Sequence, residues 1–250
     1  TLGELNKKAG FNHANQAPIM SVWFFLALAL LLLASLQHIF RKRNNCSTQI
    51  LMFVANIPLT LLIMSKMNVH TTSLFIAESV FINLFVVIIS WVIARIIKIN
   101  PLIPVFLLGT LAILADLTVN YGLIENSIMS YQLLSGIRYY GLGNEYMGVL
   151  LATAICFSAL LLQDSPSLPN QVLVAFIFSI AIFMTAYPSL GSNVGGAITA
   201  NLGLWYTFLR LKGHTIDIKK ILLLIIGTMV FISIIIFIDI NQPLGSQSHL

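Results

Sequence analysis

The chain has 250 residues, of which 58% are hydrophobic and only 8% are charged, and its mean hydropathy is +0.94. These values exclude a soluble globular domain and indicate a polytopic membrane protein. The formal net charge of +5 does not indicate nucleic-acid binding, because the basic residues fall in short loops between apolar runs. Cys46 and Cys156 lie in a basic loop and in an apolar run, so neither a disulfide nor a thiolate metal site is expected.

Apolar runs of transmembrane length follow one another along the chain. A hydropathy window of about 19 residues predicts an all-α bundle of about eight transmembrane helices, and we expect Pro58 to kink the second. The bundle spans residues 20–239, between an extracytoplasmic segment at 1–19 and an extracytoplasmic tail at 240–250. The predicted spans cover residues 20–40, 49–65, 73–97, 101–118, 144–162, 171–186, 196–211 and 221–238.

Charged residues sort between the two sides when these spans are threaded alternately. Basic residues from Arg41 to Arg43 and at Arg95, Lys98 and Arg210 fall on one side, which the positive-inside rule makes cytoplasmic. Both chain ends then lie on the outer side. Because no signal peptide precedes the first span, this predicts that the sequence is a piece of a longer protein. The outer side also receives these acids: Glu4, Glu78, Asp116, Glu125, Glu145 and Asp239.

The segment Gly136–Gly148 is the most chemically dense part of the sequence. It leads from the predicted outer loop at 119–143 into the fifth span. We expect Asn144 to cap that helix, with free N–H groups facing outward beside Arg138, which is the arrangement of an anion site. In the alternative, Arg138 and Glu145 form a salt bridge that holds the loop on the bundle, and the tyrosines belong to an interfacial belt. The candidate substrate-binding residues here are Arg138, Tyr139, Tyr140, Gly143 and Asn144.

A second glycine-rich stretch, Tyr187–Gly196, stands at the outer start of the seventh span. It aligns with the first at an offset of about 48 residues, which predicts a parallel repeat of the last two hairpins. On this prediction Asn193 and Gly195 join Asn144 around one outer cavity, as in broken-helix sites. Shared helix-start chemistry is the alternative explanation of the similarity.

Catalytic candidates are the acids near the outer helix ends. Glu145 and Asp116 are favoured as a general base, Asp116 because its surroundings are apolar. No metal-ligand spacing is present, so no metal site is predicted, and the sequence identifies no cofactor. Small residues from Gly195 to Gly203 predict a packing seam of the seventh helix against Gly148 and Ala152.

The string Gly-x-Arg-Tyr-Tyr-Gly-Leu-Gly-Asn-Glu-Tyr-Met-Gly, with the later Pro-x-Leu-Gly-x-Asn-x-Gly-Gly and the final Ser-His-Leu, resembles an uncharacterised family of bacterial multi-span membrane proteins, mainly Gram-positive. Some of these resemble fusions to an extracytoplasmic alkaline-phosphatase-like domain. The resemblance covers residues 116–250. It implies a location in the bacterial plasma membrane, and it places these residues at motif positions: Asp116, Arg138, Tyr140, Asn144, Glu145, Asn193 and His249.

Three functions fit these features. The favoured one is a cell-envelope protein with an outward-facing polar site for an anionic substrate that is phosphate-bearing or lipid-linked. A transporter or lipid flippase is the second, and a membrane anchor for an extracytoplasmic enzyme domain is the third. The expected partners are membrane lipids, that substrate and an extracytoplasmic domain of the same or a neighbouring chain. Whether the protein is an enzyme stays open.

Overall fold

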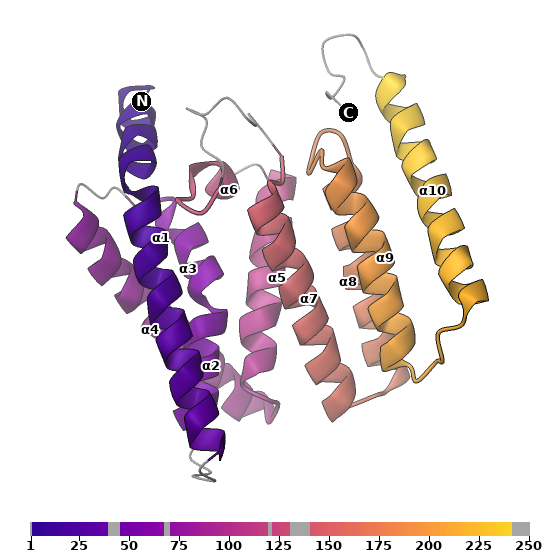
Figure 1. The fold of residues 1–250 in the computed structure, drawn as a ribbon, viewed down its shortest axis with the longest axis horizontal. Coiled ribbons are helices and arrows are strands. Elements are labelled where there is room, and N and C mark those ends of the chain that lie inside the picture. The colour runs from indigo at the N-terminus through magenta and orange to yellow at the C-terminus, as the bar shows by residue number, and fades with distance from the viewer. Residues whose placement is uncertain (1, 40–45, 68–70, 120–121, 131–140, 242–250) are drawn as a thin grey trace. The chain divides into compact units, whose positions relative to one another are not determined.

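The computed structural model describes residues 2–39, 46–67, 71–119, 122–130 and 141–241, and these ranges contain ten helices and no strand (Figure 1). The predicted all-α class is therefore confirmed. The helices are α1 (Leu2–Ile39), α2 (Cys46–Ala55), α3 (Ile57–Met64), α4 (Thr72–Ile97), α5 (Leu102–Val119), α6 (Leu123–Asn126), α7 (Asn144–Asp164), α8 (Leu168–Ala186), α9 (Val194–Leu211) and α10 (Ile218–Ile240).

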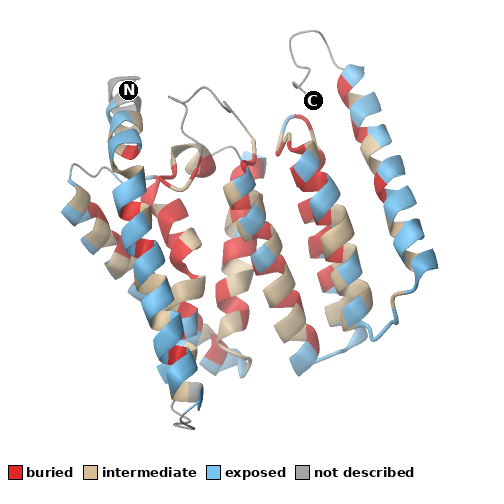
Figure 2. Ribbon diagram, viewed as in Figure 1, coloured by how far each residue is buried: buried red, intermediate tan, exposed pale blue. Residues whose placement is uncertain are grey.

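Six of these helices are long and apolar enough to cross a membrane, namely α1, α4, α5, α7, α8 and α10. The bent pair of α2 and α3 makes a seventh span if the two are counted together. Many of their apolar side chains are exposed, and only 11% of the most apolar window of α10 is buried (Figure 2). Such helices indicate a multi-pass membrane protein whose exposed faces meet lipid. The predicted seventh span coincides with α9, which is not among the candidates found in the described residues, so the count of eight stays a prediction.

The helix that contains the first predicted span begins well before Met20. α1 is one helix from Leu2 to Ile39 with Pro18 inside it, so residues 2–19, predicted as an extracytoplasmic segment, are helical. Side chains spaced four residues apart hold this first part of the helix. Lys8 Nζ donates to Met67 O at 3.2 Å, Asn12 Nδ2 to Asn126 O at 3.0 Å, and Gln16 Nε2 to Ile128 O at 2.9 Å. These bonds link α1 to distant loops, which is why a local pattern did not reveal them.

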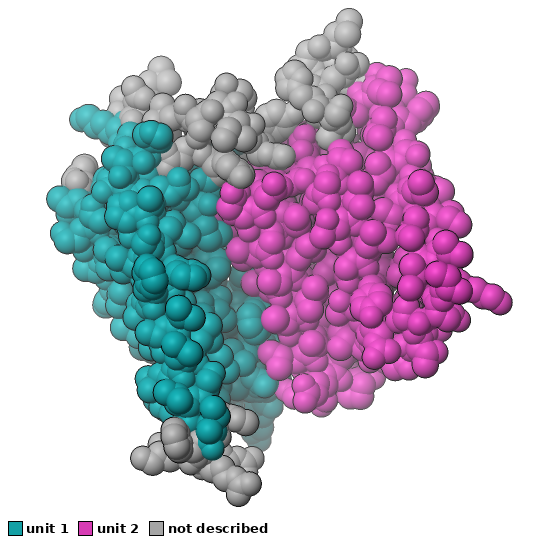
Figure 3. Space-filling model, viewed as in Figure 1, with its two compact units in different colours: residues 1–112, 122–139 teal, residues 113–121, 140–250 magenta. Residues whose placement is uncertain are grey.

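The chain forms two compact units, shown in different colours in Figure 3. Unit 1 comprises Thr1–Ala112 and Gly122–Tyr139. Its buried hydrophobic cluster joins α1, α3, α4 and the segment after α6, and consists of Ile19, Trp23, Ile57, Leu61, Met64, Phe75 and Ile128.

Unit 2 comprises Ile113–Tyr121 and Tyr140–Leu250. Within it, α9 contacts α7, α8 and α10. Ala186, Ala197 and Ile235 form a buried cluster that joins α8, α9 and α10. The short side chains of α9 thus allow one helix to pack against three neighbours.

The helix formed by α2 and α3 bends by 42° near Pro58, as predicted. Proline has no N–H, so Val54 O cannot receive its usual helical hydrogen bond, and the backbone before the ring is displaced. Asn83 of α4 supplies a donor to the carbonyl next to it, since Asn83 Nδ2 donates to Phe53 O at 3.3 Å. Asn56 Nδ2 donates to Thr60 Oγ1 at 3.2 Å and to Asn83 O at 3.4 Å. Both asparagines are fully buried, so the bend is held by amide side chains inside the unit.

Replacing Asn83 by Leu should destabilise the protein by about 1–2 kcal/mol, because Phe53 O loses its side-chain donor in a partly buried position. Ser90→Ala is the matched control on the same helix. Ser90 Oγ is buried and has no hydrogen-bond partner among the described residues, so removing this hydroxyl should leave the stability unchanged or raise it. Denaturant unfolding in mixed micelles measures both variants. Equal stabilities of Asn83→Leu and wild type would contradict the role of Asn83.

Candidate functional site

The start of α7 differs from the prediction in its cap. Asn144 was expected to be the N-cap, but the N-cap is Gly143, in extended conformation and with no side-chain hydrogen bond. Asn144 is the first helical residue and is exposed. Glycine fits the extended backbone but has no side-chain acceptor, so Gly143 itself gives the first N–H groups of α7 no side-chain hydrogen bond. Glu145 lies in this first turn, where the helix dipole favours a negative charge.

Asn193 connects the starts of α7 and α9. It is the N-cap of α9, and its Oδ1 accepts from Gly196 N at 2.7 Å. Its Nδ2 donates to Leu142 O at 2.9 Å and to Asn144 Oδ1 at 3.3 Å. The side chain is buried, with both polar atoms bonded within the protein. The structure therefore brings Asn144 and Asn193 together, as the sequence predicted. The hydrogen bonds of the Asn193 side chain hold the starts of α7 and α9 together, and we call these two starts, with the turn before α9, braced.

The turn between α8 and α9 packs its backbone against both neighbouring segments. Gly191 N donates to Met184 O at 2.8 Å, and Gly191 O accepts from Leu142 N at 2.7 Å. A Cβ on Gly191 would lie 2.5 Å from Met184 O, and one on Gly141 would lie 2.4 Å from Gly191 O. Gly141 also has a φ of +83°. Only glycine permits this backbone approach, which is what fixes the two helix starts to each other.

The helix starts of the two hairpins of unit 2 are spaced by 50 residues, whereas the glycine-rich stretches align at an offset of about 48. α9 begins 50 residues after α7 (194 against 144), and α10 begins 50 residues after α8 (218 against 168). The predicted offset of 48 instead aligns Glu145 with Asn193, although one is inside its helix and the other is a cap. At an offset of 50, Gly141 matches Gly191, the residue it packs against. The repeat itself stays a prediction.

The two acids proposed as bases have different surroundings. Glu145 is half-buried, and its Oε2 is buried without a hydrogen-bond partner among the described residues. Asp116 is buried near the end of α5, has an interaction partner, and does not take part in the bonds of Asn193. Glu145 is therefore the carboxylate that lies at the braced helix starts. Among the described residues no group of three His, Cys, Asp or Glu could hold a metal ion.

Several predicted residues lie outside the described part of the chain. Arg138, Tyr139, Tyr140 and His249 belong to this group, so their proposed roles stay predictions. Gly195 is described and exposed, one residue before the buried Gly196.

The predicted packing seam holds for α9 but not for α7. Gly196, Ala197 and Ala200 are buried, whereas the expected partners Gly148 and Ala152 are exposed. A Cβ on Gly196 would lie 2.9 Å from Met147 Cγ, so the seam meets α7 at that side chain instead.

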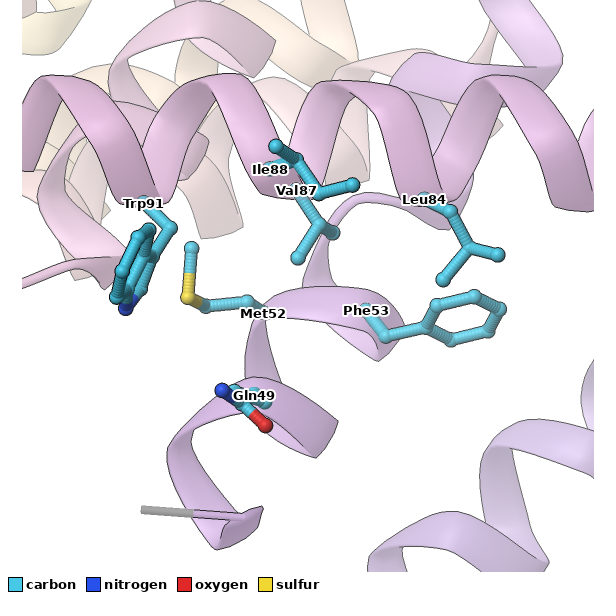
Figure 4. Close-up of a pocket in the computed structure, with 7 residues that line it drawn as sticks. All are labelled: Gln49, Met52, Phe53, Leu84, Val87, Ile88 and Trp91. Carbon is cyan, nitrogen blue, oxygen red and sulfur yellow. The ribbon is translucent and has the colours of Figure 1, made fainter.

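Sequence reasoning missed a cavity of about 370 Å³ in unit 1. It lies between α2 and α4, whose side chains face each other across it (Figure 4). The sequence signal that could have pointed to it is the Trp91–Arg95 pair, one helical turn apart at the end of the apolar run of α4. The lining residues are Gln49, Met52, Phe53, Leu84, Val87, Ile88 and Trp91.

Comparison of the chain with protein-family models, with curated proteins and with solved structures gave no match. The residues and their geometry therefore carry the functional interpretation.

Gly191→Ala should destabilise the protein by about 1–3 kcal/mol, because the new methyl group would meet backbone atoms of Met184 and Thr185 that cannot move away. Gly148→Ala is the matched control in α7, since nothing lies within 4 Å of its position. We expect it to be neutral or stabilising by up to about 1 kcal/mol through helix propensity. Unfolding in mixed micelles tests the pair, and equal effects would show that the turn is not tightly packed.

Proposed function

We propose that this is a cell-envelope membrane protein with an outward-facing polar site at the start of α7, which binds an anionic ligand that is phosphate-bearing or lipid-linked. One observation carries the proposal. Gly143 gives α7 no side-chain cap, and Asn193 is occupied by its own bonds. The N-terminal N–H groups of α7 are thus not capped by either residue, and a helix start attracts anions through its N–H groups and dipole.

The outward orientation follows from the distribution of basic residues. In unit 2, α9 begins at the braced turn and ends at Arg210 and Lys212, and Lys219 and Lys220 open α10 after the connecting loop. The proposal counts α9 as a membrane-crossing helix, and a basic loop of this kind then belongs on the cytoplasmic side. The start of α9, and the start of α7 that it contacts, then face outward.

Arg138 and Glu145 complete the proposed site. Arg138 lies five residues before the N-cap Gly143 and would supply the positive charge that a phosphate requires. Glu145, with a carboxylate oxygen that has no described partner, would pair with Arg138 in the empty site and serve as general base if the ligand is processed. Asp116 is the second candidate base. Asn144 is exposed at the helix start and can contact the ligand.

Arg138→Ala should weaken binding of a polyprenyl phosphate about tenfold or more, because one charge-assisted hydrogen bond contributes about 1.5–3 kcal/mol. Titration of the purified protein in detergent micelles measures this affinity. Arg210→Ala is the control, since it removes the same charge at the far end of α9. Unchanged affinity in Arg138→Ala would refute the site. Full function of Arg138→Ala and Glu145→Gln in cells would favour the membrane anchor instead.

A transporter or lipid flippase is the second candidate, and the interrupted helix in unit 1 favours it. Transporters place polar groups at breaks in membrane helices. Here Asn56 is fully buried at the 42° bend, and its Oδ1 has no hydrogen-bond partner in the described part of the chain. Substrate uptake or lipid scrambling by the reconstituted protein tests this function. We expect Asn56→Leu to abolish any such activity while Ser90→Ala retains it. An inert wild-type protein in vesicles would exclude this candidate.

A further inference from the structure

The cavity between α2 and α4 is a mostly apolar groove, and several of its lining side chains are exposed at the surface of unit 1. Its floor includes Met52, which is fully buried. Its α4 wall is partly exposed, with Leu84 at 47%, Ile88 at 59% and Trp91 at 38% exposure. In a membrane-spanning unit such an open apolar wall is in contact with hydrocarbon. The groove therefore has the chemistry to hold an acyl chain.

One end of the groove is polar and positively charged. Gln49 and Trp91 lie at this end, away from Phe53 and Leu84 (Figure 4). Arg95 follows Trp91 by one helical turn on the same face of α4, and its guanidinium lies 4.9 Å from the centroid of the indole ring. Arg95 is exposed, and none of the described carboxylates is paired with it. An arginine stacked on an interfacial tryptophan is a suitable partner for a lipid phosphate.

The apolar lining of the groove and the positive charge at one end of it together favour one kind of occupant. We propose that the α2–α4 groove binds an anionic phospholipid, with one acyl chain between Met52 and Ile88 and the phosphate against Arg95. Lys98, one turn beyond Arg95 at the end of α4, adds a second positive charge on the headgroup side. The acyl chains of a zwitterionic lipid fit the apolar groove equally well. The positive group of its headgroup, however, offsets part of the attraction between the phosphate and the two basic residues, so binding should prefer an anionic headgroup. This site is separate from the proposed site on α7 and stands without it.

Native mass spectrometry of the full chain, purified in detergent and titrated with phosphatidylglycerol or phosphatidylcholine, tests the proposal. We expect tighter binding of phosphatidylglycerol, reduced roughly fivefold in Arg95→Gln and unchanged in the control Arg210→Gln. Val87→Trp, which fills the groove, should reduce binding of both lipids while Arg95→Gln removes only the preference between them.

Three results would overturn the proposal. The first is equal binding of the two lipids by the wild type, and the second is equal effects of Arg95→Gln and Arg210→Gln. The third is a dimer that Val87→Trp dissociates without changing lipid binding, because a second copy of the chain would then occupy the groove. A thermal-unfolding midpoint of Val87→Trp within a few degrees of the wild type shows that loss of lipid is not loss of fold.

Discussion

Every interruption of a helix inside a membrane protein leaves backbone groups that lipid cannot satisfy. This constraint governs the bend near Pro58 and the turn before α9. Pro58 creates one interruption, and Asn83 supplies the donor that Phe53 O then accepts. The turn before α9 creates another, and Asn193 together with the backbone of Met184 and Leu142 satisfies it. In both places a buried asparagine donates a hydrogen bond to a nearby backbone carbonyl.

The same constraint divides the polar residues of unit 2 into two roles. Asn193 is buried and fully bonded, so its part is to hold two helix starts together. Asn144 is exposed, Gly143 leaves the helix uncapped, and Glu145 keeps an oxygen without a described partner. These residues are the ones left to meet a ligand. The proposed anion site is therefore formed by the start of α7, and not by a cavity that both glycine-rich stretches line equally.

The sequence was a good guide to the helices because their apolar runs follow directly from the requirements of a bilayer. It was a poorer guide where contacts with residues far along the chain determine the local structure. The first turns of α1 depend on bonds from Asn12 and Gln16 to residues more than a hundred positions away. Asn144 was misassigned as a cap because asparagine favours that position locally, whereas the N-cap is Gly143 and Asn144 Oδ1 accepts a hydrogen bond from Asn193 Nδ2. The helix starts of the last two hairpins are 50 residues apart, whereas the glycine-rich letters align at 48, because glycines that match in sequence need not match in the helix.

The central claim is that the start of α7 is an accessible polar site on the outer face. Cysteine labelling tests it most directly, in a background with Cys46 and Cys156 replaced by serine. We expect Asn144→Cys to react with a membrane-impermeant maleimide in intact cells. Lys212 is the C-cap of α9, at the opposite end of that helix from Asn193, so we expect Lys212→Cys to react only after the cells are opened. Labelling of Asn144→Cys only in opened cells, with Lys212→Cys labelled in intact ones, would contradict the claim.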